Sequence, residues 1–349
     1  MSGFFSQKYK ELVPYVPGEQ PQGRSYIKLN TNESPFPPSP RAVAAAAEAA
    51  KKLQLYSDPE MRLLKKKLSE VYGVPENAIF VCNGSDEVLN FAFMAFCDQG
   101  AVFPDVTYGF YEVFAQLNGV KYRKIPLKSD FTVDPADYTG TNETAFLANP
   151  NAPTGVFLPV KEIEKILSSN ERRLVVVDEA YIDFGGESCL PLIKKYCNLL
   201  VTRTFSKSRS MAGARLGYAF ASPALIADLE TVKYSTNPYN VNAMTAAAGI
   251  GALEDGDYTE KNCLTIASNR AFAAEELEKL SFTVLPSRAN FLFARHATVG
   301  GEELYLRLKE KGILVRHFGA ERIKDFLRIT VGSKEEMRAL TEALKEILK

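Results

Sequence analysis

The stretch 201–220, which reads VTRTFSKSRSMAGARLGYAF, places a single lysine among hydroxyl and cationic side chains. Lys207 follows Ser206, and Arg215 comes after a run of small residues. The apolar residues 199–201 predict a buried strand, and α/β proteins place their chemistry in the loops that follow such strands. Hydroxyl groups and an arginine suit a phosphate-like anion, and a lysine amine beside them could act as a nucleophile. The stretch therefore predicts an anion site with a reactive lysine next to it.

Two further predicted strands end in polar turns. The run FVCNGSDE puts Ser85 and Asp86 at a strand-to-helix turn, where the free amides of a first helical turn bind anions. The run LANPNAPTG ends a strand with Asn149 and Asn151, whose side chains offer both a donor and an acceptor. Each motif alone is also explained by local structure, namely a helix N-cap at Ser85 and a rigid proline turn around the asparagines.

A third predicted strand ends in an acid. Asp178 directly follows three valines in VVVDEAYIDF, and Tyr181 lies three residues further on. A carboxylate at the end of a buried strand is costly unless a cation meets it, as in a structural ion pair or a ligand contact. Because ligands of open α/β sheets bind at the carboxyl ends of the strands, these polar residues together predict one shared ligand site.

Sequence signatures of several other protein classes are missing. We find no GxGxxG after a strand, no GxxxxGKS/T, no HExxH and no GxSxG, so dinucleotide binding, P-loop hydrolysis, zincin chemistry and the α/β-hydrolase elbow lack their markers. Only two histidines occur, and the five cysteines form no CxxC pair. This pattern predicts neither a metal site nor a disulfide framework, and we expect all five cysteines to be buried.

The composition limits the classes of binding partner that we expect for this chain. The chain has 349 residues, of which 46% are hydrophobic, and this length favours two lobes over one core. Lys plus Arg and Asp plus Glu both number 42, so the charge balance predicts no nucleic-acid partner. No apolar run approaches the ~18 residues of a membrane span, and the first residues have no signal-peptide pattern. We therefore expect a cytoplasmic protein that acts on small molecules.

The order of the predicted elements indicates an α/β fold. Residues 1–40 are rich in Pro, Gly and Asn, which predicts an extended arm that joins a smaller domain. In residues 41–252, short apolar strands alternate with amphipathic helical patterns, which predicts a large, doubly wound and mostly parallel sheet. Residues 253–349 begin with a long helical pattern and continue with strands between helices, which predicts a smaller α+β domain.

The motifs, taken in their order, resemble those of one enzyme family. They are LNTNE, GSDE, DVTYGFY, NPNAPTG, DEAYIDF, TFSK and LRITVG, and they extend over nearly the whole chain. The chain resembles the fold-type I aminotransferases, which depend on pyridoxal 5'-phosphate, and among them it is most similar to the histidinol-phosphate aminotransferases. The resemblance implies their fold, a large cofactor domain with a smaller second domain, and a homodimer.

The resemblance implies roles for the residues found above. Lys207 would bind the cofactor as a Schiff base and move protons, Asp178 would pair with the protonated ring nitrogen, and Tyr181 would hydrogen-bond the ring hydroxyl. Tyr108 would stack on the face of the ring. The residues that would hold the cofactor phosphate are Ser85, Asp86, Thr204, Ser206, Arg215 and Tyr56 of the partner subunit.

One position departs from the family pattern. Family members commonly have Asn directly before Pro-Thr-Gly, where it contacts the ring hydroxyl, whereas this chain has Ala152. Asn151 stands one residue earlier, and we expect it to take over the contact, with Asn149 as the alternative.

The resemblance also implies a substrate and a reaction. Arg316 and Arg328 match arginines that grip a substrate phosphate. Other residues expected near the substrate are Tyr15, Asn32, Glu33 and, across the dimer, Tyr239. The implied reaction converts L-histidinol phosphate and 2-oxoglutarate into imidazole-acetol phosphate and L-glutamate, a step of histidine biosynthesis.

The sequence leaves other functions open. A threonine-phosphate decarboxylase shares the motifs and also binds a phosphorylated substrate, and a broad aromatic or aspartate-type aminotransferase is possible too. An alternative of another class is a non-catalytic regulator that binds pyridoxal phosphate. Such regulators carry a DNA-binding domain, whereas about thirty residues precede LNTNE in this chain.

Overall fold

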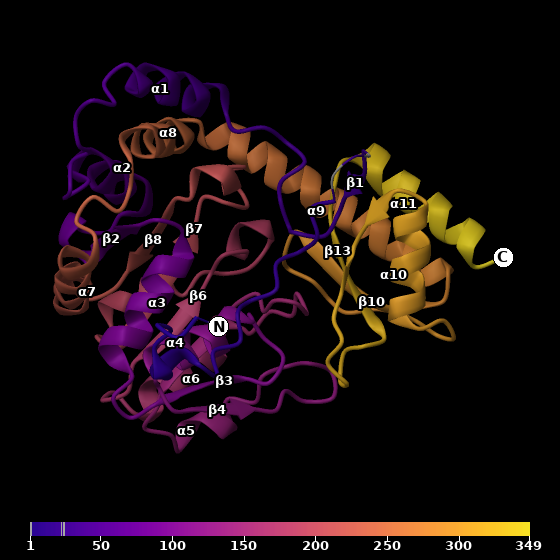
Figure 1. The fold of residues 1–349 in the computed structure, drawn as a ribbon, viewed down its shortest axis with the longest axis horizontal. Helices are drawn as coiled ribbons and strands as arrows, with labels where there is room; N and C mark the ends of the chain where they lie inside the picture. Colours follow the sequence, from indigo (N-terminus) through magenta and orange to yellow (C-terminus); the bar gives the residue numbers. More distant parts are fainter. Residues whose placement is uncertain (1, 22, 24) are drawn as a thin grey trace.

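Residues 2–21, 23 and 25–349 are described in the computed structural model, in which a large sheet and a smaller sheet lie side by side (Figure 1). The large sheet has seven strands in the order β2-β8-β7-β6-β5-β3-β4. Only β8 runs antiparallel to its neighbours, so the sheet is mostly parallel, as the sequence predicts. The strands are β2 (Ile79–Cys82), β3 (Ala101–Pro104), β4 (Tyr122–Ile125), β5 (Thr144–Ala148), β6 (Val175–Asp178), β7 (Leu199–Thr204) and β8 (Gly217–Phe220).

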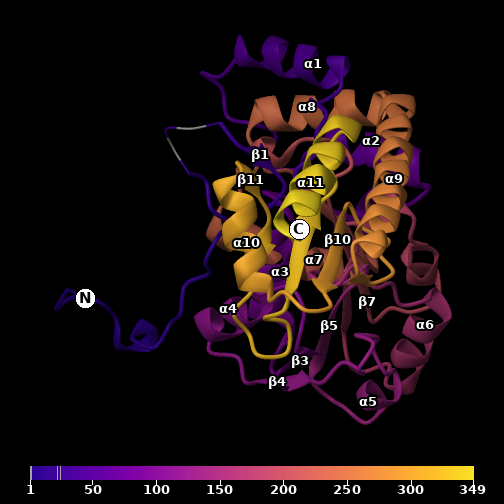
Figure 2. The ribbon, with the colours of Figure 1, turned by 90° about the vertical axis from the view of Figure 1, so that its right-hand side faces the viewer.

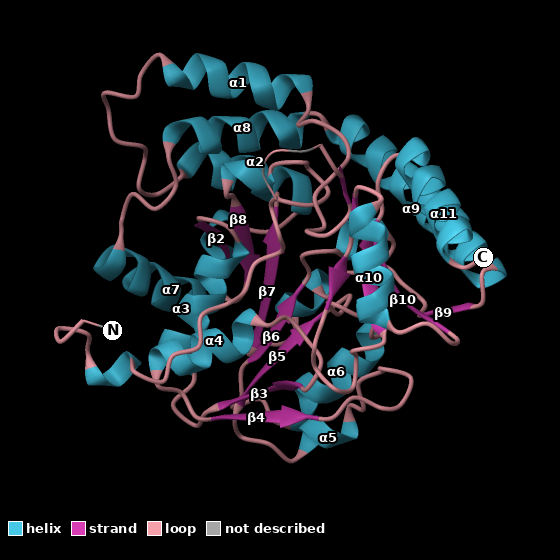
Figure 3. Ribbon diagram, turned by 45° about the vertical axis from the view of Figure 1, so that its right-hand side comes forward, coloured by secondary structure: helices cyan, strands magenta, loops and turns pink. Residues whose placement is uncertain are grey.

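Helices cover both faces of the large sheet (Figure 3). They are α1 (Pro40–Ala50), α2 (Arg62–Tyr72), α3 (Ser85–Phe96), α4 (Phe110–Asn118), α5 (Ala136–Thr139), α6 (Val160–Ser169), α7 (Pro223–Thr236) and α8 (Ala243–Glu254). Short 3-10 turns lie at Gln7–Tyr9, Glu76–Ala78, Ile182–Phe184, Leu190–Lys194 and Ala212–Ala214.

Alternation along the strands divides the core of this lobe between the two faces. Val176 and Leu200 pack with residues of α3, α4 and α7. Val175, Val177 and Val201 pack with residues of α2, α6 and α8 on the opposite face. Because successive side chains of a strand point to opposite faces, Asp178 lies on the same face as Val176, beside α3 and α4.

The smaller sheet is antiparallel, in the order β12-β13-β10-β9. Its strands are β9 (Phe282–Val284), β10 (Phe291–His296), β12 (Arg316–His317) and β13 (Phe326–Thr330), and its helices are α9 (Gly256–Lys279), α10 (Gly301–Glu310) and α11 (Lys334–Ile347). These elements share a second apolar core. Thus α9, α10 and α11 lie where the sequence predicts helices, and strands alternate with them as expected.

The N-terminal segment reaches the smaller sheet. Strand β1 (Ile27–Lys28) pairs in parallel with β11 (Ile313–Leu314), so the chain after residue 28 starts beside the smaller lobe and crosses to α1. Residues closer to the N-terminus extend to one side of the molecule (Figure 2). The predicted domain boundaries at residues 40 and 252 fall at the start of α1 and within α8, and the division itself stays a prediction.

Two simple properties follow from the described residues. None of their helices combines the length and the apolar character needed to cross a membrane. Within the same residues, no group of histidine, cysteine, aspartate and glutamate side chains could hold a metal ion. The prediction that all cysteines are buried is wrong for Cys197, which is exposed, while Cys82, Cys97, Cys189 and Cys263 are buried.

Candidate active site

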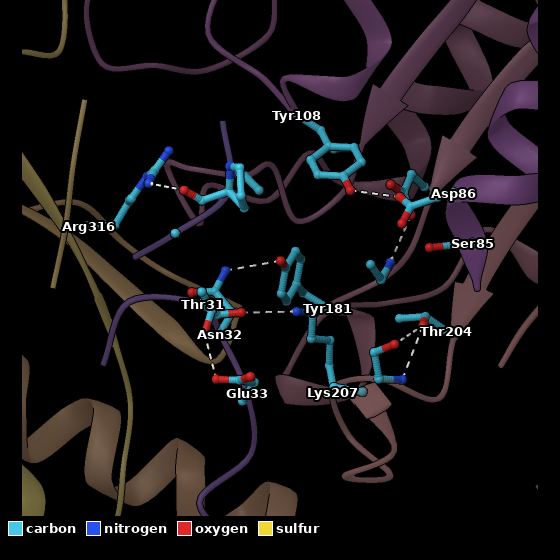
Figure 4. A pocket seen from close by; sticks show the side chains of 18 of the residues that line it. Thr31, Asn32, Glu33, Ser85, Asp86, Tyr108, Tyr181, Thr204, Lys207 and Arg316 are labelled. Carbon is cyan, nitrogen blue, oxygen red and sulfur yellow. Dashed lines mark hydrogen bonds between the residues drawn. The ribbon is translucent and has the colours of Figure 1, made fainter. Parts of the chain in front are cut away.

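A cavity of about 380 Å³ opens between the carboxyl ends of the large sheet and the smaller sheet (Figure 4). The predicted residues that line it are Tyr15, Asn32, Glu33, Ser85, Asp86, Tyr108, Asp178, Tyr181, Thr204, Ser206, Lys207, Arg215, Arg316 and Arg328. The cavity therefore collects residues from the N-terminal segment, both sheets and the loop after β7.

Lys207 lies in the loop that follows β7, and its side chain lines the cavity. Its Nζ lies 3.4 Å from the Thr31 carbonyl oxygen, to which it donates, and 5.7 Å from the centre of the Tyr181 ring. No carboxylate of the described residues lies within ion-pair distance of this amine. The amine is therefore available to a ligand in the cavity, as a nucleophile must be.

Asp178 is buried at the end of β6, and none of the described cationic side chains pairs with it. Its oxygens accept hydrogen bonds from the Thr202 hydroxyl at 3.1 Å, the Ala180 amide at 3.2 Å and, more weakly, the Tyr111 hydroxyl at 3.4 Å. Burial raises the pKa of this carboxyl to about 6, against the opposing effect of the Thr202 hydrogen bond. A ligand that brings a cationic N–H to this carboxylate would offset the cost of its burial.

An anion cradle forms at the start of α3. Ser85 begins the helix after Gly84, whose φ of 76° lies in the left-handed region that favours glycine. A Cβ at Gly84 would lie 2.6 Å from the Arg215 guanidinium, and one at Gly217 would lie 2.5 Å from the Ser85 amide nitrogen. The absence of side chains at both glycines thus leaves room for the Arg215 guanidinium and the Ser85 amide, two groups that suit a phosphate.

The remaining donors of this cradle are already oriented. The Thr204 hydroxyl donates to the Ser206 hydroxyl at 2.9 Å, and the Ser206 backbone amide donates to the Thr204 hydroxyl oxygen at 3.1 Å. The Asp86 carboxylate accepts from Arg215 at 3.0 Å and from the Tyr108 hydroxyl at 2.7 Å. Burial, together with the charge of Asp86, raises the pKa of Tyr108 well above its usual value, so its hydroxyl stays protonated. The donor set therefore fits the phosphate, and Asp178 fits the ring nitrogen, of pyridoxal phosphate.

Tyr181 faces the cavity from the turn after β6 and is buried. Its hydroxyl oxygen accepts a hydrogen bond from the Asn32 side-chain nitrogen at 3.0 Å, and its ring meets Phe291 edge-on at 5.0 Å between ring centres. These contacts hold the phenol in one orientation between the two lobes.

Two arginines bring positive charge from the smaller sheet. Arg316 and Arg328 are direct neighbours across β12 and β13. Arg316 donates to the carbonyl oxygens of Val16 and Pro17 at 2.9 and 3.0 Å, and Arg328 donates to that of Asn30 at 2.9 Å. Within the described chain, neither guanidinium has a carboxylate within ion-pair distance, and the Nε of Arg328 has no hydrogen-bond partner. Burial lowers the pKa of Arg328.

Asn151 is not brought to the cavity. Its amide nitrogen donates to the Val106 carbonyl and to Thr154, and its oxygen accepts from Thr107. Asn149 is equally engaged, since it donates to and accepts from the backbone of Leu158. Asn149 therefore bonds within its own loop, Asn151 joins this loop to the loop after β3, and Ala152 lines the cavity with a methyl group instead. This geometry corrects the expectation that Asn151 takes over the contact of the missing asparagine.

Tyr56 and Tyr239 also lie outside the cavity of their own chain. Their rings stack at 4.5 Å, and their exposed fractions are 82% and 42%. The sequence reasoning assigned both residues to the partner's site, which a single chain does not contain.

A buried ion pair behind the cavity was missed by the sequence reasoning, together with the exposed Asp183 beside it. Glu179 and Arg203 pair at 2.9 Å on the face of the sheet opposite to the cavity. Asp183 accepts from Arg203 at 3.4 Å and from Ser208 at 2.5 Å. The signal was present in the sequence, because Glu179 and Arg203 are charged residues next to buried strand positions, where an unpaired charge is costly.

Comparisons with known proteins show the family of the chain. The family model described as "Aminotransferase class I and II" matches residues 24–344. The chain is 47% identical over its full length to the full-length histidinol-phosphate aminotransferase of Brachyspira hyodysenteriae. It is 49% identical to histidinol-phosphate aminotransferase 2 of Dechloromonas aromatica, with 99% of each chain covered. The crystal structure of histidinol-phosphate aminotransferase from Sinorhizobium meliloti in complex with pyridoxal-5'-phosphate is 27% identical, with a TM-score of 0.90 over 100% of this chain and 98% of that one.

Proposed function

Since the chain belongs to the class I and II aminotransferases, we propose that it transfers the amino group between L-histidinol phosphate and 2-oxoglutarate. The products are imidazole-acetol phosphate and L-glutamate, so the enzyme serves histidine biosynthesis, and the cofactor is pyridoxal 5'-phosphate. The observation that carries the proposal is the pair Arg316 and Arg328, two cations without carboxylate partners that open onto the same cavity as Lys207. Relatives with 47–49% identity over essentially the whole chain bear the name of this activity.

The cofactor, when bound, supplies an electron sink that stabilises negative charge on the reacting carbon of the substrate. The chain holds its phosphate with the first amides of α3, the hydroxyl groups of Thr204 and Ser206 and the Arg215 guanidinium. Asp178 would accept the N–H of the ring and keep it protonated, and Tyr108 would contact the face of the ring. Tyr181 would donate its hydroxyl hydrogen to the oxygen on the ring.

Lys207 has two tasks in the proposed reaction. Its Nζ would hold the cofactor covalently, and the free Lys207 amine would carry a proton from and to the reacting carbon of the substrate. The Thr31 carbonyl, which accepts from Nζ at 3.4 Å, keeps the free amine directed into the cavity. The N-terminal segment thereby contributes to the orientation of the lysine.

Arg316 and Arg328 select the substrate. Histidinol phosphate carries a phosphate and lacks the carboxylate of an amino acid, so a pair of guanidinium groups offers it planar donors for several oxygens. In the second half of the reaction the same cations receive the carboxylates of glutamate. Tyr15, which stacks on Phe110 at 4.3 Å, forms the wall of the cavity on the side of the N-terminal segment.

The proposed enzyme is a cytoplasmic homodimer. Tyr56 and Tyr239 present a stacked aromatic pair on the surface, which is costly for a monomer and useful at an interface. In the dimer Tyr56 reaches the cofactor phosphate of the partner, and Tyr239 reaches its substrate.

The test uses the protein loaded with pyridoxal phosphate, without an amino acceptor. On addition of histidinol phosphate, the visible absorbance of the cofactor should disappear within one turnover, and 2-oxoglutarate should restore it. Threonine phosphate should release no carbon dioxide. Unphosphorylated histidinol and aromatic amino acids should react at least ten-fold more slowly, because they leave the arginines unpaired. Release of carbon dioxide from threonine phosphate, or equal rates for phosphorylated and unphosphorylated amines, would contradict the proposal.

A further inference from the structure

Asn32 is held in one orientation by contacts on three sides. Its backbone N–H donates to the Thr330 hydroxyl at 2.9 Å, and the Thr330 hydroxyl donates to the Asn32 side-chain oxygen at 3.1 Å. Its carbonyl oxygen accepts from the Asn290 side chain at 3.0 Å. Its φ of 57° lies in the left-handed region, which Asn and Gly tolerate best. The side-chain oxygen is thus fixed towards Thr330, so the NH₂ group must face the opposite way.

This NH₂ group determines the direction of the Tyr181 hydroxyl. It donates to the Tyr181 oxygen at 3.0 Å, and both residues are buried (Figure 4). Because a donor occupies the tyrosine oxygen on the side of Asn32, the hydroxyl hydrogen cannot point there and is directed to the cavity. Donation to a phenol oxygen also makes its own O–H a stronger donor, since hydrogen bonds in a chain polarise one another.

The neighbouring wall offers no substitute for this donor. Ala152 lines the cavity with a methyl group, and the side-chain amides of Asn149 and Asn151 donate to Leu158, Val106 and Thr154 instead. The hydrogen-bond donation that the cavity offers beside Ala152 therefore depends on the Tyr181 hydroxyl.

We infer that Asn32 is a positioning residue that locks the Tyr181 hydroxyl as a donor towards the ring oxygen of the bound cofactor. This inference rests on the proposed function, because it concerns the cofactor of that same site. It also changes the role expected for Asn32, from a contact with the substrate to a contact with Tyr181.

The consequence is measurable in the absorbance of the bound cofactor. A hydrogen-bond donor beside the ring oxygen of the cofactor stabilises the anionic form of that oxygen. It therefore favours loss of the proton on the neighbouring Lys207 nitrogen that is bound to the cofactor. Loss of the donor therefore raises the pH at which the absorbance changes from the protonated to the unprotonated form. A hydrogen bond to a charged group contributes enough for a rise of about one to two pH units.

The decisive variant is Asn32→Asp, which keeps the size of the side chain and tolerates the same backbone conformation. Its carboxylate can only accept, so it should draw the Tyr181 hydrogen away from the cavity. We expect the spectroscopic pKa to rise by about one unit or more, as in Tyr181→Phe. The variant Asn32→Gly, which suits the positive φ and merely removes the lock, should give a smaller rise of roughly half a unit.

The added charge is separated from the hydrogen bond by combining Asn32→Asp with Tyr181→Phe. If the direction of the hydroxyl matters, Asn32→Asp should shift the pKa much less in the Tyr181→Phe background than in the wild-type background. Equal shifts in both backgrounds, or no shift in Asn32→Asp and Asn32→Gly, would overturn the inference. If Asn32→Asp does not fold by circular dichroism, Thr330→Val replaces it, because it frees the Asn32 amide to rotate, and an unchanged pKa in Thr330→Val would equally overturn the inference.

The same titration distinguishes a failure of the proposed function from a failure of the role inferred for Asn32. A wild-type protein that takes up pyridoxal phosphate without a visible, pH-dependent band would contradict the proposed function and this inference with it. A normal wild-type titration with unchanged Asn32 variants would contradict the inference alone. Ala152→Asn adds a second donor at the wall, and it should lower the pKa and reduce the effect of Asn32→Gly.

Discussion

Ser208, the residue after Lys207, donates a hydrogen bond to Asp183 with 2.5 Å between Oγ and Oδ2. Asp183 lies two residues after Tyr181, so this bond joins the lysine loop to the segment that carries the tyrosine. Asp183 also pairs with Arg203 at 3.4 Å, and Arg203 pairs with Glu179 at 2.9 Å. Each member of this network is a near sequence neighbour of a residue that lines the cavity.

The network lies on the opposite side of the strand ends because side chains alternate along a strand. Asp178 and Thr202 face the cavity side, whereas Glu179 and Arg203 face the other side. The buried ion pair therefore holds the ends of β6 and β7 together directly beneath the site.

Arg203→Ala should destabilise the protein by about 3–5 kcal/mol, since Glu179 would remain buried without its cation. The measurement is the free energy of unfolding in urea. Arg123→Ala is the matched control, because Arg123 is exposed and its partner Glu143 is only half-buried, and its loss should cost at most ~1 kcal/mol. Similar losses in both variants would argue against a structural role for the buried pair.

Asp178→Asn should make the cofactor-free protein more stable at neutral pH. Burial raises the pKa of Asp178 from 3.8 to about 6, so the folded protein binds this proton more tightly than the unfolded chain. Stability from this group is therefore complete at pH values below ~4 and is lost as the pH rises through about 6, by roughly 2–3 kcal/mol. Urea unfolding should show an advantage of that order for Asp178→Asn at pH 7.5, which vanishes near pH 4.

The same variant should impair the loaded enzyme, because the amide cannot keep the ring nitrogen protonated by charge. The rate of proton removal in a single turnover should fall strongly while the cofactor stays bound through its phosphate. Equal single-turnover rates would leave Asp178 without the proposed role.

Lys207→Ala should fold normally and lose transamination. Loss of the proton-transfer group alone costs about 10²–10⁴-fold in rate, and loss of the covalent link adds to this. Single-turnover conversion of the cofactor absorbance measures the effect, with the exposed Lys165→Ala as the control. Near wild-type turnover in Lys207→Ala would exclude the proposed chemistry.

Arg316→Ala and Arg328→Ala should separate the two substrates. Each lost charge-assisted hydrogen bond costs about 1.5–3 kcal/mol, which is roughly one to two decades in kcat/KM. Arg316→Ala should impair histidinol phosphate much more than histidinol, and Arg328→Ala should impair both histidinol phosphate and glutamate. Arg295→Ala, an exposed arginine of the same sheet, should change neither. Equal losses for phosphorylated and unphosphorylated amines would favour an amino-acid aminotransferase.

Tyr56→Ala should be rescued in a hybrid dimer with Lys207→Ala if Tyr56 serves the partner's site. Each variant alone should be nearly inactive. In the hybrid, one site has both its own lysine and the tyrosine of the other chain, so purified hybrids should regain about half of the wild-type activity. A hybrid as inactive as its parents would place Tyr56 in its own chain's site, and full activity of Tyr56→Ala alone would place it outside any site.

The sequence by itself determined which residues stand at the strand ends. Asp178 directly follows three valines, and the alternation of the strand decides the face that it occupies, while Ser85 and Lys207 follow their apolar runs within a few residues. These are local relationships, so the pattern of residue types is sufficient to predict them, and the helices of the C-terminal region follow in the same way from their periodicity.

Only the tertiary structure decided what meets across the cavity. Asn32 contacts Tyr181 and Thr330, which are 149 and 298 residues away in the chain, and Asn151 turns to Val106 instead of the cavity. The hydrogen-bonding capacity of an asparagine is the same in either place. Which partner it finds depends on how the N-terminal segment, the large sheet and the smaller sheet pack together, because every buried amide must be satisfied by the groups that packing brings within reach.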